Sequence, residues 1–416
     1  MLRRWPSQRL GRQMIWTCRV RQTCWTPNTP LSRRDRETLH QGFRIRQGIT
    51  GSRTLFTSVI PPLLVPPAMF VGLLLGLWAW KCFWIIVMQD KLLYLSWLPP
   101  FARSETVEDY MAECKPVQWV EKHFHSLDGT KLAVCEGRMP NVISSGSNRR
   151  SVVICYFQGN GGSTPMRLPL LSQILRTIND TKPTISSDAV DYTILALSYR
   201  GYWRSSGRST QSGIERDAQA FLSWVTEMYS APDVDLQVVL WGHSLGSAVA
   251  STALATYLSQ RVNDEKPAQT ATHISGMVME APTSSIKDML ISLYPQKWLP
   301  YRYLWPFSWN NWDSTEAFKR LARYRDAAPT TTSTRPASRL PPPILILSAE
   351  NDEVIPPYVA GDLHRSGKAL GLDVEWKEVP GAMHIEAPVK PDGRKALVEF
   401  LFKSTSPCHL REKMGQ

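Results

Sequence analysis

Cysteine is sparse in this 416-residue chain, and no pattern joins its seven copies. They are odd in number and scattered, without a C-x-x-C pair and without a histidine spaced to complete a zinc site. The distribution therefore gives no support for a disulfide scaffold or a structural zinc site. Cys155 lies inside an apolar run, where a free cysteine serves as a small core residue.

Acidic residues are nearly absent from the first 53 residues, which hold twelve arginines against only Asp35 and Glu37. This segment carries +10 of the formal net charge of +12, so the rest of the chain carries only +2. That balance excludes a basic nucleic-acid-binding body, whose charge would lie on the folded domain. Residues 1–53 also lack hydrophobic periodicity, and we expect a disordered tail. A mitochondrial targeting peptide has a similar composition and stays an alternative.

One apolar run is long enough to cross a membrane. Residues 68–88 contain Lys81 as their single charge, and as a helix they span roughly 31 Å, the thickness of a hydrocarbon core. We predict a transmembrane helix there, with Trp78, Trp80 and Trp84 helping to anchor the end toward which Lys81 extends. A buried helix or a hairpin anchor is the alternative, because the preceding run at 61–67 is interrupted by prolines.

The charges beside this run predict an orientation. Arg44, Arg46 and Arg53 precede it, whereas the charges that follow it nearly cancel. The positive-inside rule then places the N-terminus in the cytosol and the C-terminal body in a lumen or outside the cell. The endoplasmic reticulum is the preferred membrane, and the plasma membrane or a mitochondrial membrane stays open.

From residue 119 onward the pattern changes to short apolar runs separated by helical stretches. Two runs flank Asp128-Gly129 as a hairpin would, and six further runs are continuous enough to be buried strands. The expected strands are 119–126, 131–139, 151–157, 192–199, 237–243, 275–281, 343–349 and 373–379. Strands and helices alternating after an opening hairpin predict an α/β fold with a mostly parallel eight-stranded sheet and helices on both faces.

The stretch G-H-S-L-G at 242–246 follows the fifth expected strand and precedes small, helix-tolerant residues. A serine between two glycines at such a junction indicates a tight strand-to-helix turn that exposes a nucleophile. The five letters also occur by chance, so Ser244 needs a base, an acid and oxyanion donors elsewhere in the chain.

A base and an acid follow Ser244 in the required order. His384 lies in a loop just past the last strand, whereas His364 falls in a probable helix and His409 in the polar tail. The loop after the preceding strand offers Glu350, Asp352 and Glu353, of which Asp352 suits the orientation of an imidazolium. Two alternatives stay open: Asp352 as the N-cap of a helix near residue 356, and Glu280 as the acid.

The glycine-rich loop at 156–162 leaves the third strand. Such a loop lets backbone N–H groups point into a cavity, and we predict the oxyanion donors to be the N–H groups of Asn160 and Leu245. A phosphate-binding loop is disfavoured because no G-K-[ST] sequence follows. This chemistry requires no metal and no organic cofactor.

Taken together, these motifs resemble the α/β-hydrolase superfamily, within it the membrane-anchored branch of fungal bud-emergence hydrolases and animal lysophosphatidylserine and monoacylglycerol lipases. The resemblance covers roughly 89–402. Its further motifs are QDKLLYLSWLPPFAR at 89–103, SYRGYWRSSG at 198–207, EAPTSSIKDML at 280–290, YPQKWLPYRYLW at 294–305 and ENDEVIPP at 350–357.

The chain departs from the family pattern at three positions. Gln158 stands where members have histidine, Ser198 where they have aspartate, and Trp203 where they have glycine. The first change leaves a backbone donor intact, so activity should persist. The other two changes are expected to alter the loop that bears Arg200, and with it an acyl or head-group pocket.

The resemblance also divides the chain into parts. The predicted parts are a basic tail (1–53), the transmembrane helix (68–88), a linker (89–118), a hydrolase domain (119–403) with a lid-like insertion (282–313) and a flexible loop (327–343), and a polar C-terminal tail (404–416). The aromatic residues of 282–313 are expected either to line an acyl site or to pack the domain.

The function that the motifs indicate is a single-pass membrane serine hydrolase acting on carboxylic esters or thioesters of lipid-like substrates, such as lysophospholipids or monoacylglycerols. Two alternatives remain. A serine peptidase or protein depalmitoylase would use the same triad on the same fold, and a non-catalytic membrane scaffold would keep the fold alone. Acyl length, head group and oligomeric state do not follow from the sequence.

Overall fold

The computed structural model describes residues 61–140, 149–181, 190–263, 273–327 and 340–406. The predicted basic tail lies outside these ranges, as do most of the predicted flexible loop and most of the polar C-terminal tail. The chain forms two units, residues 1–69 and residues 70–416.

Helix α1, Val65–Val87, is one continuous helix that follows a short 3-10 turn at Pro62–Leu64. The apolar span Pro62–Val87 has a mean hydropathy of 2.0 over its best window, and none of that window is buried in the protein. A core helix of a soluble protein would be mostly buried, so the buried-helix alternative does not describe α1. The helix is long and apolar enough to cross a membrane.

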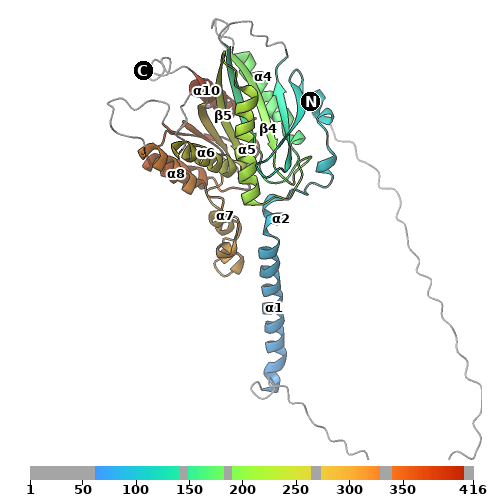
Figure 1. Cartoon of the computed structure of the whole chain (residues 1–416). Helices are drawn as coiled ribbons and strands as arrows, with labels where there is room; N and C mark the ends of the chain where they lie inside the picture. The colour runs from blue at the N-terminus through green and yellow to red at the C-terminus, as the bar shows by residue number, and fades with distance from the viewer. Residues whose placement is uncertain (1–60, 141–148, 182–189, 264–272, 328–339, 407–416) are drawn as a thin grey trace, which may run out of the picture. The chain divides into compact units, whose positions relative to one another are not determined.

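A sheet flanked by helices forms the centre of the fold (Figure 1). It has eight strands in the order β1-β2-β4-β3-β5-β6-β7-β8. Strands β1 and β2 form an antiparallel hairpin, β2 pairs antiparallel with β4, and all remaining pairs are parallel. The strands are β1 Gln118–His125, β2 Lys131–Arg138, β3 Arg149–Phe157, β4 Val190–Ser198, β5 Val234–His243, β6 His273–Glu280, β7 Ile344–Ala349 and β8 Val374–Val379. The predicted hairpin and mostly parallel sheet are confirmed.

Helices cover both faces of this sheet, and each face has its own apolar core. The longer helices are α4 Leu168–Thr181, α5 Gln211–Tyr229, α6 Leu245–Asn263, α7 Ile286–Leu293, α8 Ser314–Asp326, α9 Tyr358–Ala369 and α10 Pro391–Thr405. Apolar side chains of α5, α6, α8 and α9 belong to one core, and those of α4 and α10 to the other. Because the central strands are buried on both faces, their sequences are continuous apolar runs.

The order of the strands places two loops side by side. Strands β3 and β5 are neighbours in the sheet, but the chain continues from β3 to β4 on one side and from β5 to β6 on the other. At the carboxyl ends of β3 and β5, Phe157 pairs with Gly242. The loops that leave β3 and β5 therefore begin next to each other. In open α/β sheets this reversal point is where ligands bind.

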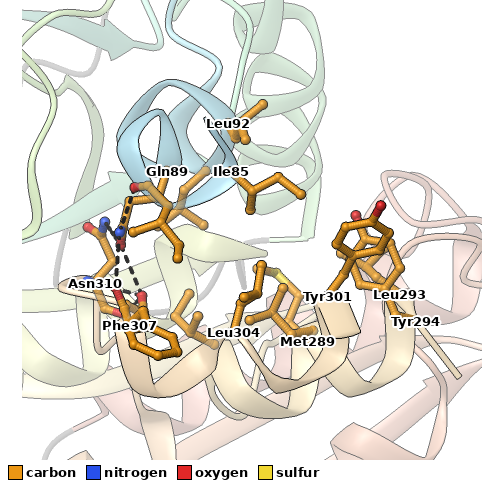
Figure 2. A pocket seen from close by; sticks show the side chains of 15 residues that line it. Ile85, Gln89, Leu92, Met289, Leu293, Tyr294, Tyr301, Leu304, Phe307 and Asn310 are labelled. Atoms are coloured by element: carbon orange, nitrogen blue, oxygen red, sulfur yellow. Dashed lines mark hydrogen bonds between the residues drawn. The ribbon is translucent and has the colours of Figure 1, made fainter. Parts of the chain in front are cut away.

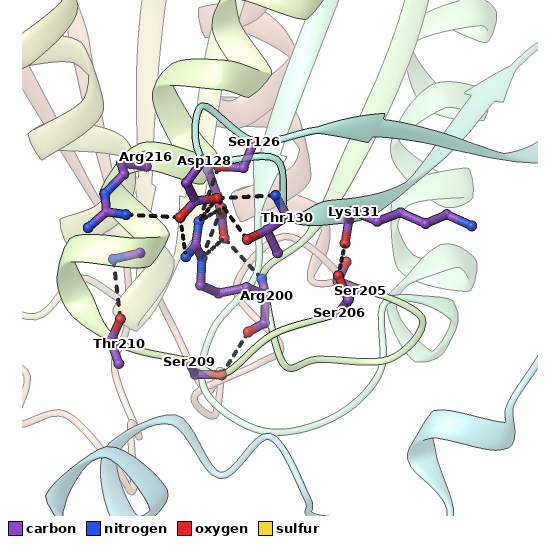
Figure 3. Close-up of polar contacts among 12 residues, drawn as sticks. Ser126, Asp128, Thr130, Lys131, Arg200, Ser205, Ser206, Ser209, Thr210 and Arg216 are labelled. Carbon is purple, nitrogen blue, oxygen red and sulfur yellow. Dashed lines mark hydrogen bonds and ion pairs between the residues drawn. The ribbon is translucent and has the colours of Figure 1, made fainter.

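The loop after β4 is held by Arg200, which is buried between the hairpin and α5 (Figure 3). Its Nη2 lies 2.7 Å from Asp217 Oδ1, and its Nη1 lies 2.8 Å from Asp128 Oδ2. The hydrogen bond from Arg200 is the largest cause that holds the pKa of Asp128 below its ordinary value. Arg200 thus serves as a structural tie between three elements, and its guanidinium is engaged by carboxylates.

Trp203 occupies the position where the family pattern has glycine. Its φ is +36°, its side chain is buried in the core on the α4 face, and its Nε1 donates to Glu105 O at 2.8 Å. Arg103 Nε in turn donates to Trp203 O at 3.0 Å. The tryptophan therefore anchors the segment between α1 and β1 to the sheet.

Candidate active site

Ser244 lies at the junction of β5 and α6 in a strained backbone conformation. Its φ is +52°, in the left-handed region that residues with a side chain rarely adopt. Its N–H donates to Glu280 O at the end of the neighbouring strand, over 2.8 Å. The serine itself is buried, with 5% of its surface exposed. Such a turn presents the hydroxyl at the carboxyl edge of the sheet.

The two glycines that flank Ser244 are required by space. A Cβ on Gly242 would lie 2.2 Å from Gly246 O, and a Cβ on Gly246 would lie 2.0 Å from Phe157 O. Both separations are far below any real contact between Cβ and oxygen. The G-x-S-x-G pattern therefore exists here because β5, α6 and β3 meet with no room for a side chain.

His384 and Asp352 are hydrogen bonded to each other, although 32 positions separate them in the sequence. His384 Nδ1 lies 2.9 Å from both carboxylate oxygens of Asp352. The side chains are 8% and 4% exposed, so water screens this contact weakly. Nδ1 faces the carboxylate, which leaves Nε2 as the nitrogen for proton exchange.

Asp352 is fixed by its own loop. Its Oδ1 accepts from Val354 N at 2.9 Å and from Ile355 N at 2.7 Å, which forms a tight turn after β7. Helix α9 begins at Tyr358 with Pro357 as its N-cap and without a side-chain cap. The alternative in which Asp352 caps this helix is therefore wrong, and the carboxylate is directed toward His384.

The loops that carry the acid and the base are joined by further hydrogen bonds that the sequence did not indicate. Glu353 Oε2 accepts from His384 N at 3.0 Å, and Glu350 Oε2 accepts from Gly381 N at 2.8 Å. Asn351 N also donates to Ala382 O at 2.9 Å. The two carboxylates beside Asp352 thus hold the backbone of the histidine loop.

His243 lies beneath His384, with their ring centroids 5.1 Å apart. Arg167 Nη2 is 3.2 Å from His243 Nδ1. Burial, followed by the neighbouring charges of Arg167 and His384, lowers the pKa of His243 well below its ordinary value. A neutral imidazole therefore separates the nucleophile turn from the guanidinium of Arg167.

Glu280 is fully enclosed at the end of β6. Glu280 Oε2 accepts from Trp241 Nε1 at 2.9 Å, and Oε1 lies 3.8 Å from His243 Nε2. Among the described residues, neither Glu280 Oε1 nor His243 Nε2 has a hydrogen-bond partner. Burial raises the pKa of Glu280 to about 7. Of the two candidate acids, only Asp352 is hydrogen bonded to His384; Glu280 lies behind the nucleophile turn.

The loop after β3 brings Asn160 beside this centre. A Cβ on the preceding Gly159 would lie 2.8 Å from His243 Nδ1, so the loop passes directly over the nucleophile turn. Within the described ranges neither the N–H of Asn160 nor that of Leu245 has a hydrogen-bond acceptor. Leu245 is the first residue of α6, where N–H groups have no partner inside the helix and favour negative charge.

Gln158, which replaces the histidine of the family pattern, is buried at the start of the same loop. Its Oε1 accepts from Thr164 Oγ1 at 3.1 Å, and its backbone oxygen accepts from Tyr199 OH at 2.9 Å. Its Nε2 is buried without a partner among the described residues. The backbone position of the loop therefore does not depend on a histidine here.

The segment after α1 also supports this loop, which is a contact that the sequence did not indicate. Helix α2, Gln89–Tyr94, ends at a left-handed Leu95. Tyr94 O accepts from Gly161 N at 2.9 Å, and Leu98 O accepts from Gly162 N at 2.7 Å. Two N–H groups of the glycine-rich loop are thereby occupied by the linker.

The candidate nucleophile and the candidate base come from different loops, after β5 and after β8. In the described part of the chain, no hydrogen bond links Ser244 Oγ to His384. Such bonds are often long in unliganded sites and shorten when substrate binds. Among the described residues, no group of three histidine, cysteine, aspartate or glutamate side chains is placed to hold a metal ion.

Comparison with known proteins gives distant relatives. The chain is 25% identical over 304 residues to "Alpha/beta hydrolase domain-containing protein WAV2" of Arabidopsis thaliana, covering 73% of this chain and 83% of that protein. It is 24% identical to "Protein bem46" of Schizosaccharomyces pombe, covering 65% and 71%. It is 29% identical to "Lysophosphatidylserine lipase ABHD12" of Xenopus tropicalis, covering 60% of this chain and 57% of that lipase.

A solved structure matches the fold. An alpha-beta hydrolase from Vibrio vulnificus aligns with a TM-score of 0.52 at 15% identity, covering 75% of this chain and 92% of that one. The model of the "Alpha/beta hydrolase family" matches residues 183–399, just over half of the chain. With the sheet order and the nucleophile turn described above, this match shows that the chain belongs to the α/β hydrolase family.

Proposed function

We propose that this protein is a membrane-anchored serine hydrolase that cleaves the ester or thioester bond of lipid-like substrates. Ser244 is the nucleophile, His384 the general base and acid, and Asp352 the group that orients His384. The N–H groups of Asn160 and Leu245 stabilise the oxyanion. These side chains and backbone groups suffice for acyl transfer to water, with no cofactor in the reaction.

The reaction would proceed in two halves. Ser244 Oγ attacks the acyl carbonyl while His384 Nε2 takes its proton, and the carbonyl oxygen becomes an anion between the two N–H groups. His384 then gives the proton to the leaving alcohol or thiol, which leaves an acyl-Ser244 ester. Water, deprotonated by His384, attacks this ester and releases the acid and free Ser244.

The single observation that carries the proposal is the position of His384. Its Nδ1 contacts both oxygens of Asp352 at 2.9 Å, while its ring lies 5.1 Å from that of His243, the residue before Ser244. The hydrogen-bonded pair of Asp352 and His384 therefore lies beside the turn that carries Ser244 in a left-handed conformation. A scaffold protein has no need for a strained serine, a buried carboxylate and a buried imidazole at one sheet edge.

The lipid part of the proposal has two supports. The apolar helix α1 would hold the hydrolase domain at a membrane surface, where lipid esters reside. One of the relatives is named as a lysophosphatidylserine lipase. This chain spans about half the length of that lipase, so the head group is a separate question.

The membrane orientation also forms part of the proposal. The arginines before the apolar span, including Arg44, Arg46 and Arg53, favour a cytosolic N-terminus with the hydrolase domain in a lumen or outside the cell. The endoplasmic reticulum is the preferred site. A glycosylation tag placed after residue 406, modified only on the lumenal side, would test this; an unmodified tag opposes the orientation.

Hydrolysis of p-nitrophenyl esters by the full chain in detergent tests the chemistry. The wild type should release p-nitrophenol, and Ser244→Ala should lower kcat by about 10⁴-fold or more. Ser251→Ala is the matched control, because Ser251 is a buried serine on α6 whose hydroxyl donates to Ala248 O in the same helix. Equal rates for wild type and Ser244→Ala would refute the proposal.

The same preparation separates the rival substrates. Peptide, acyl-cysteine and lysophospholipid turnover are compared at equal protein concentration. Turnover of peptides or acyl-cysteine above that of lysophospholipid would replace the lipid esterase with a peptidase or depalmitoylase on the same triad.

A further inference from the structure

An apolar cavity of about 230 Å³ lies between the end of α1, helix α2 and the segment that follows β6. Figure 2 shows Ile85 and Leu92 on one side of it and Met289 and Leu304 on the other, with Gln89 and Asn310 toward one end. Apolar side chains form most of the lining, and a few polar groups lie at its margin. This is the pattern of a site for an apolar ligand.

One wall of this cavity belongs to the predicted membrane span. Ile85 and Ile86 are half-buried against the cavity, whereas their neighbours Phe83, Trp84 and Val87 are exposed. Tyr301 on the opposite wall lies beneath Lys81, with Nζ 4.8 Å from the ring centroid. Lys81 contacts Tyr301 and Gln89 contacts Trp309, so both contact the segment 286–309. These two residues are eight positions apart, which corresponds to about 12 Å of helix.

The segment at 286–309 carries exposed aromatic side chains on its outside. The exposed fractions are 76% for Trp298, 52% for Tyr303, 40% for Trp305, 61% for Phe307 and 53% for Trp309. Tryptophan and tyrosine are enriched where proteins meet the interface of a bilayer. A patch of this kind beside a membrane helix fits lipid head groups better than open water.

The same segment is fastened to the helix by hydrogen bonds at one end of the cavity. Gln89 Oε1 accepts from Trp309 N at 3.0 Å, and Asp90 Oδ1 accepts from Trp309 Nε1 at 3.1 Å and from Asn310 Nδ2 at 2.8 Å. These hydrogen bonds hold the two walls of the cavity together at that end.

Two residues that line the cavity connect it to the loops of the candidate active site. Leu93 lines it, and the following residue, Tyr94, accepts the hydrogen bond from Gly161 in the oxyanion loop. Met289 lines it too, and also lines a smaller hollow formed partly by Ile355, whose N–H donates to Asp352. The walls of the cavity are therefore built partly from residues that adjoin the supports of the catalytic loops.

We propose that this cavity binds the acyl chain of a single-chain lipid that enters from the bilayer, between α1 and the segment 286–309. The inference rests on the proposed function, since it assigns the acyl site of that reaction. The cavity volume is below the range of about 300–1,000 Å³ typical for drug-sized ligands, which favours a single acyl chain over two. The substrate class is a lysophospholipid or monoacylglycerol type of ester.

Chain-length selectivity tests the cavity. The measured quantity is the ratio of kcat/KM for p-nitrophenyl decanoate to that for the acetate, in the full chain. Each buried methylene should raise the wild-type value about fourfold until the cavity is filled. Met289→Trp and Ile85→Trp fill the cavity from its two walls and should lower the ratio at least about tenfold. Met228→Trp, at an exposed position on α5, is the control and should leave the ratio unchanged.

The outcomes separate the two proposals. If both cavity variants keep the wild-type ratio of decanoate to acetate kcat/KM, the acyl site is overturned. It is also overturned if both variants lose the same factor in kcat/KM on both esters. In either case the proposed chemistry at Ser244 still stands. Absence of acetate hydrolysis in the wild type refutes the proposed function itself. Using one variant on each wall keeps the test decisive if either protein fails to fold.

Entry from the bilayer has its own measurement, which needs no catalysis. Ser244→Ala protein is placed in phosphatidylcholine vesicles with a lysophosphatidylcholine that carries a diazirine at the end of its chain. After irradiation, adducts should appear in the peptide that contains Met289 and Leu293, and should be lost in Met289→Trp. Adducts confined to the exposed stretch Phe70–Leu77 of α1 would overturn entry through the cavity.

Discussion

The loops after β7 and β8 differ sharply from the segment 286–309, although both lie at the carboxyl edge of one sheet. In the first region the side chains of Asp352 and His384 are almost fully buried, and Glu350 and Glu353 join the two loops by accepting hydrogen bonds from Gly381 N and His384 N. In the second, Trp298 is 76% exposed and short 3-10 turns replace long helices.

The difference shows how one fold meets two requirements. Proton transfer needs groups held within a fraction of an ångström, and a dense network of short hydrogen bonds supplies that precision. Binding a flexible apolar chain at a membrane needs exposed apolar surface and some freedom to repack. The two ends of the segment 286–309 are nevertheless held together by the residues beside them. Ser285 forms a β-bridge with Asp313, and Ile286 N donates to Trp312 O.

The largest effect is expected from a substitution of the acid in the loop after β7. Asp352→Asn removes the anion that orients His384 and should lower kcat for p-nitrophenyl acetate about 10⁴-fold, with a small change in KM. Asp373→Asn, at an exposed position before β8, is the control. A kcat for Asp352→Asn within tenfold of the wild type would show that this acid is not the orienting group.

The next effect concerns the turn that presents Ser244. Gly246→Ala places a Cβ 2.0 Å from Phe157 O and 2.6 Å from Gln158 O, so α6 and the start of the oxyanion loop must separate. We expect destabilisation of about 3 kcal/mol or more, or a folded protein with a strongly reduced rate, because overpacking at backbone atoms has no cheap relaxation. Gly76→Ala, with no atom near the new Cβ, is the control. A thermal melt and a rate both equal to wild type would contradict the geometry.

A smaller effect comes from the support of the histidine loop. Glu353→Ala removes the acceptor of His384 N, so the imidazole should occupy its productive position less often. We expect kcat to fall about tenfold while KM stays nearly constant, since the change acts through positioning. Glu378→Ala, exposed on β8, serves as control. Equal losses in both variants would remove the special role of Glu353.

The smallest effect is a pH dependence of stability. Because burial raises the pKa of Glu280 to about 7, its contribution is present below its unfolded pKa and is lost as pH rises through about 7. His243, whose pKa is lowered, contributes above its unfolded pKa of 6.5 and loses stability only as pH falls. His243 is present in both proteins, so the stability of wild type relative to Glu280→Gln isolates Glu280 and should fall by about 1 kcal/mol between pH 6.5 and 8 in detergent. A difference between the two proteins that stays constant over this range contradicts this assignment.

The sequence was sufficient to locate the strands and the order of the triad candidates, because buried parallel strands are continuous apolar runs and each candidate follows the end of one. Ser244, Asp352 and His384 all lie at strand ends on one edge, where the sheet brings distant loops together.

Other contacts had no signature in the sequence. Tyr94 and Leu98 support the oxyanion loop through backbone oxygens, which any residue type would provide. The partners of Arg200 come from α5 and from the hairpin turn, so the motif around Arg200 alone could not reveal its role as a structural tie. Such contacts depend on packing between elements, which sequence periodicity does not specify.

The most direct test of the central claim is to find the residue that a fluorophosphonate modifies in the full chain. The labelled protein is digested and the adduct is located by mass spectrometry, in wild type, His384→Ala and Ser251→Ala. A single adduct on Ser244 in wild type and Ser251→Ala, absent in His384→Ala, is the predicted result. An adduct on another residue, or an unlabelled Ser244 in the folded wild type, would contradict the claim that Ser244 and His384 form the catalytic centre.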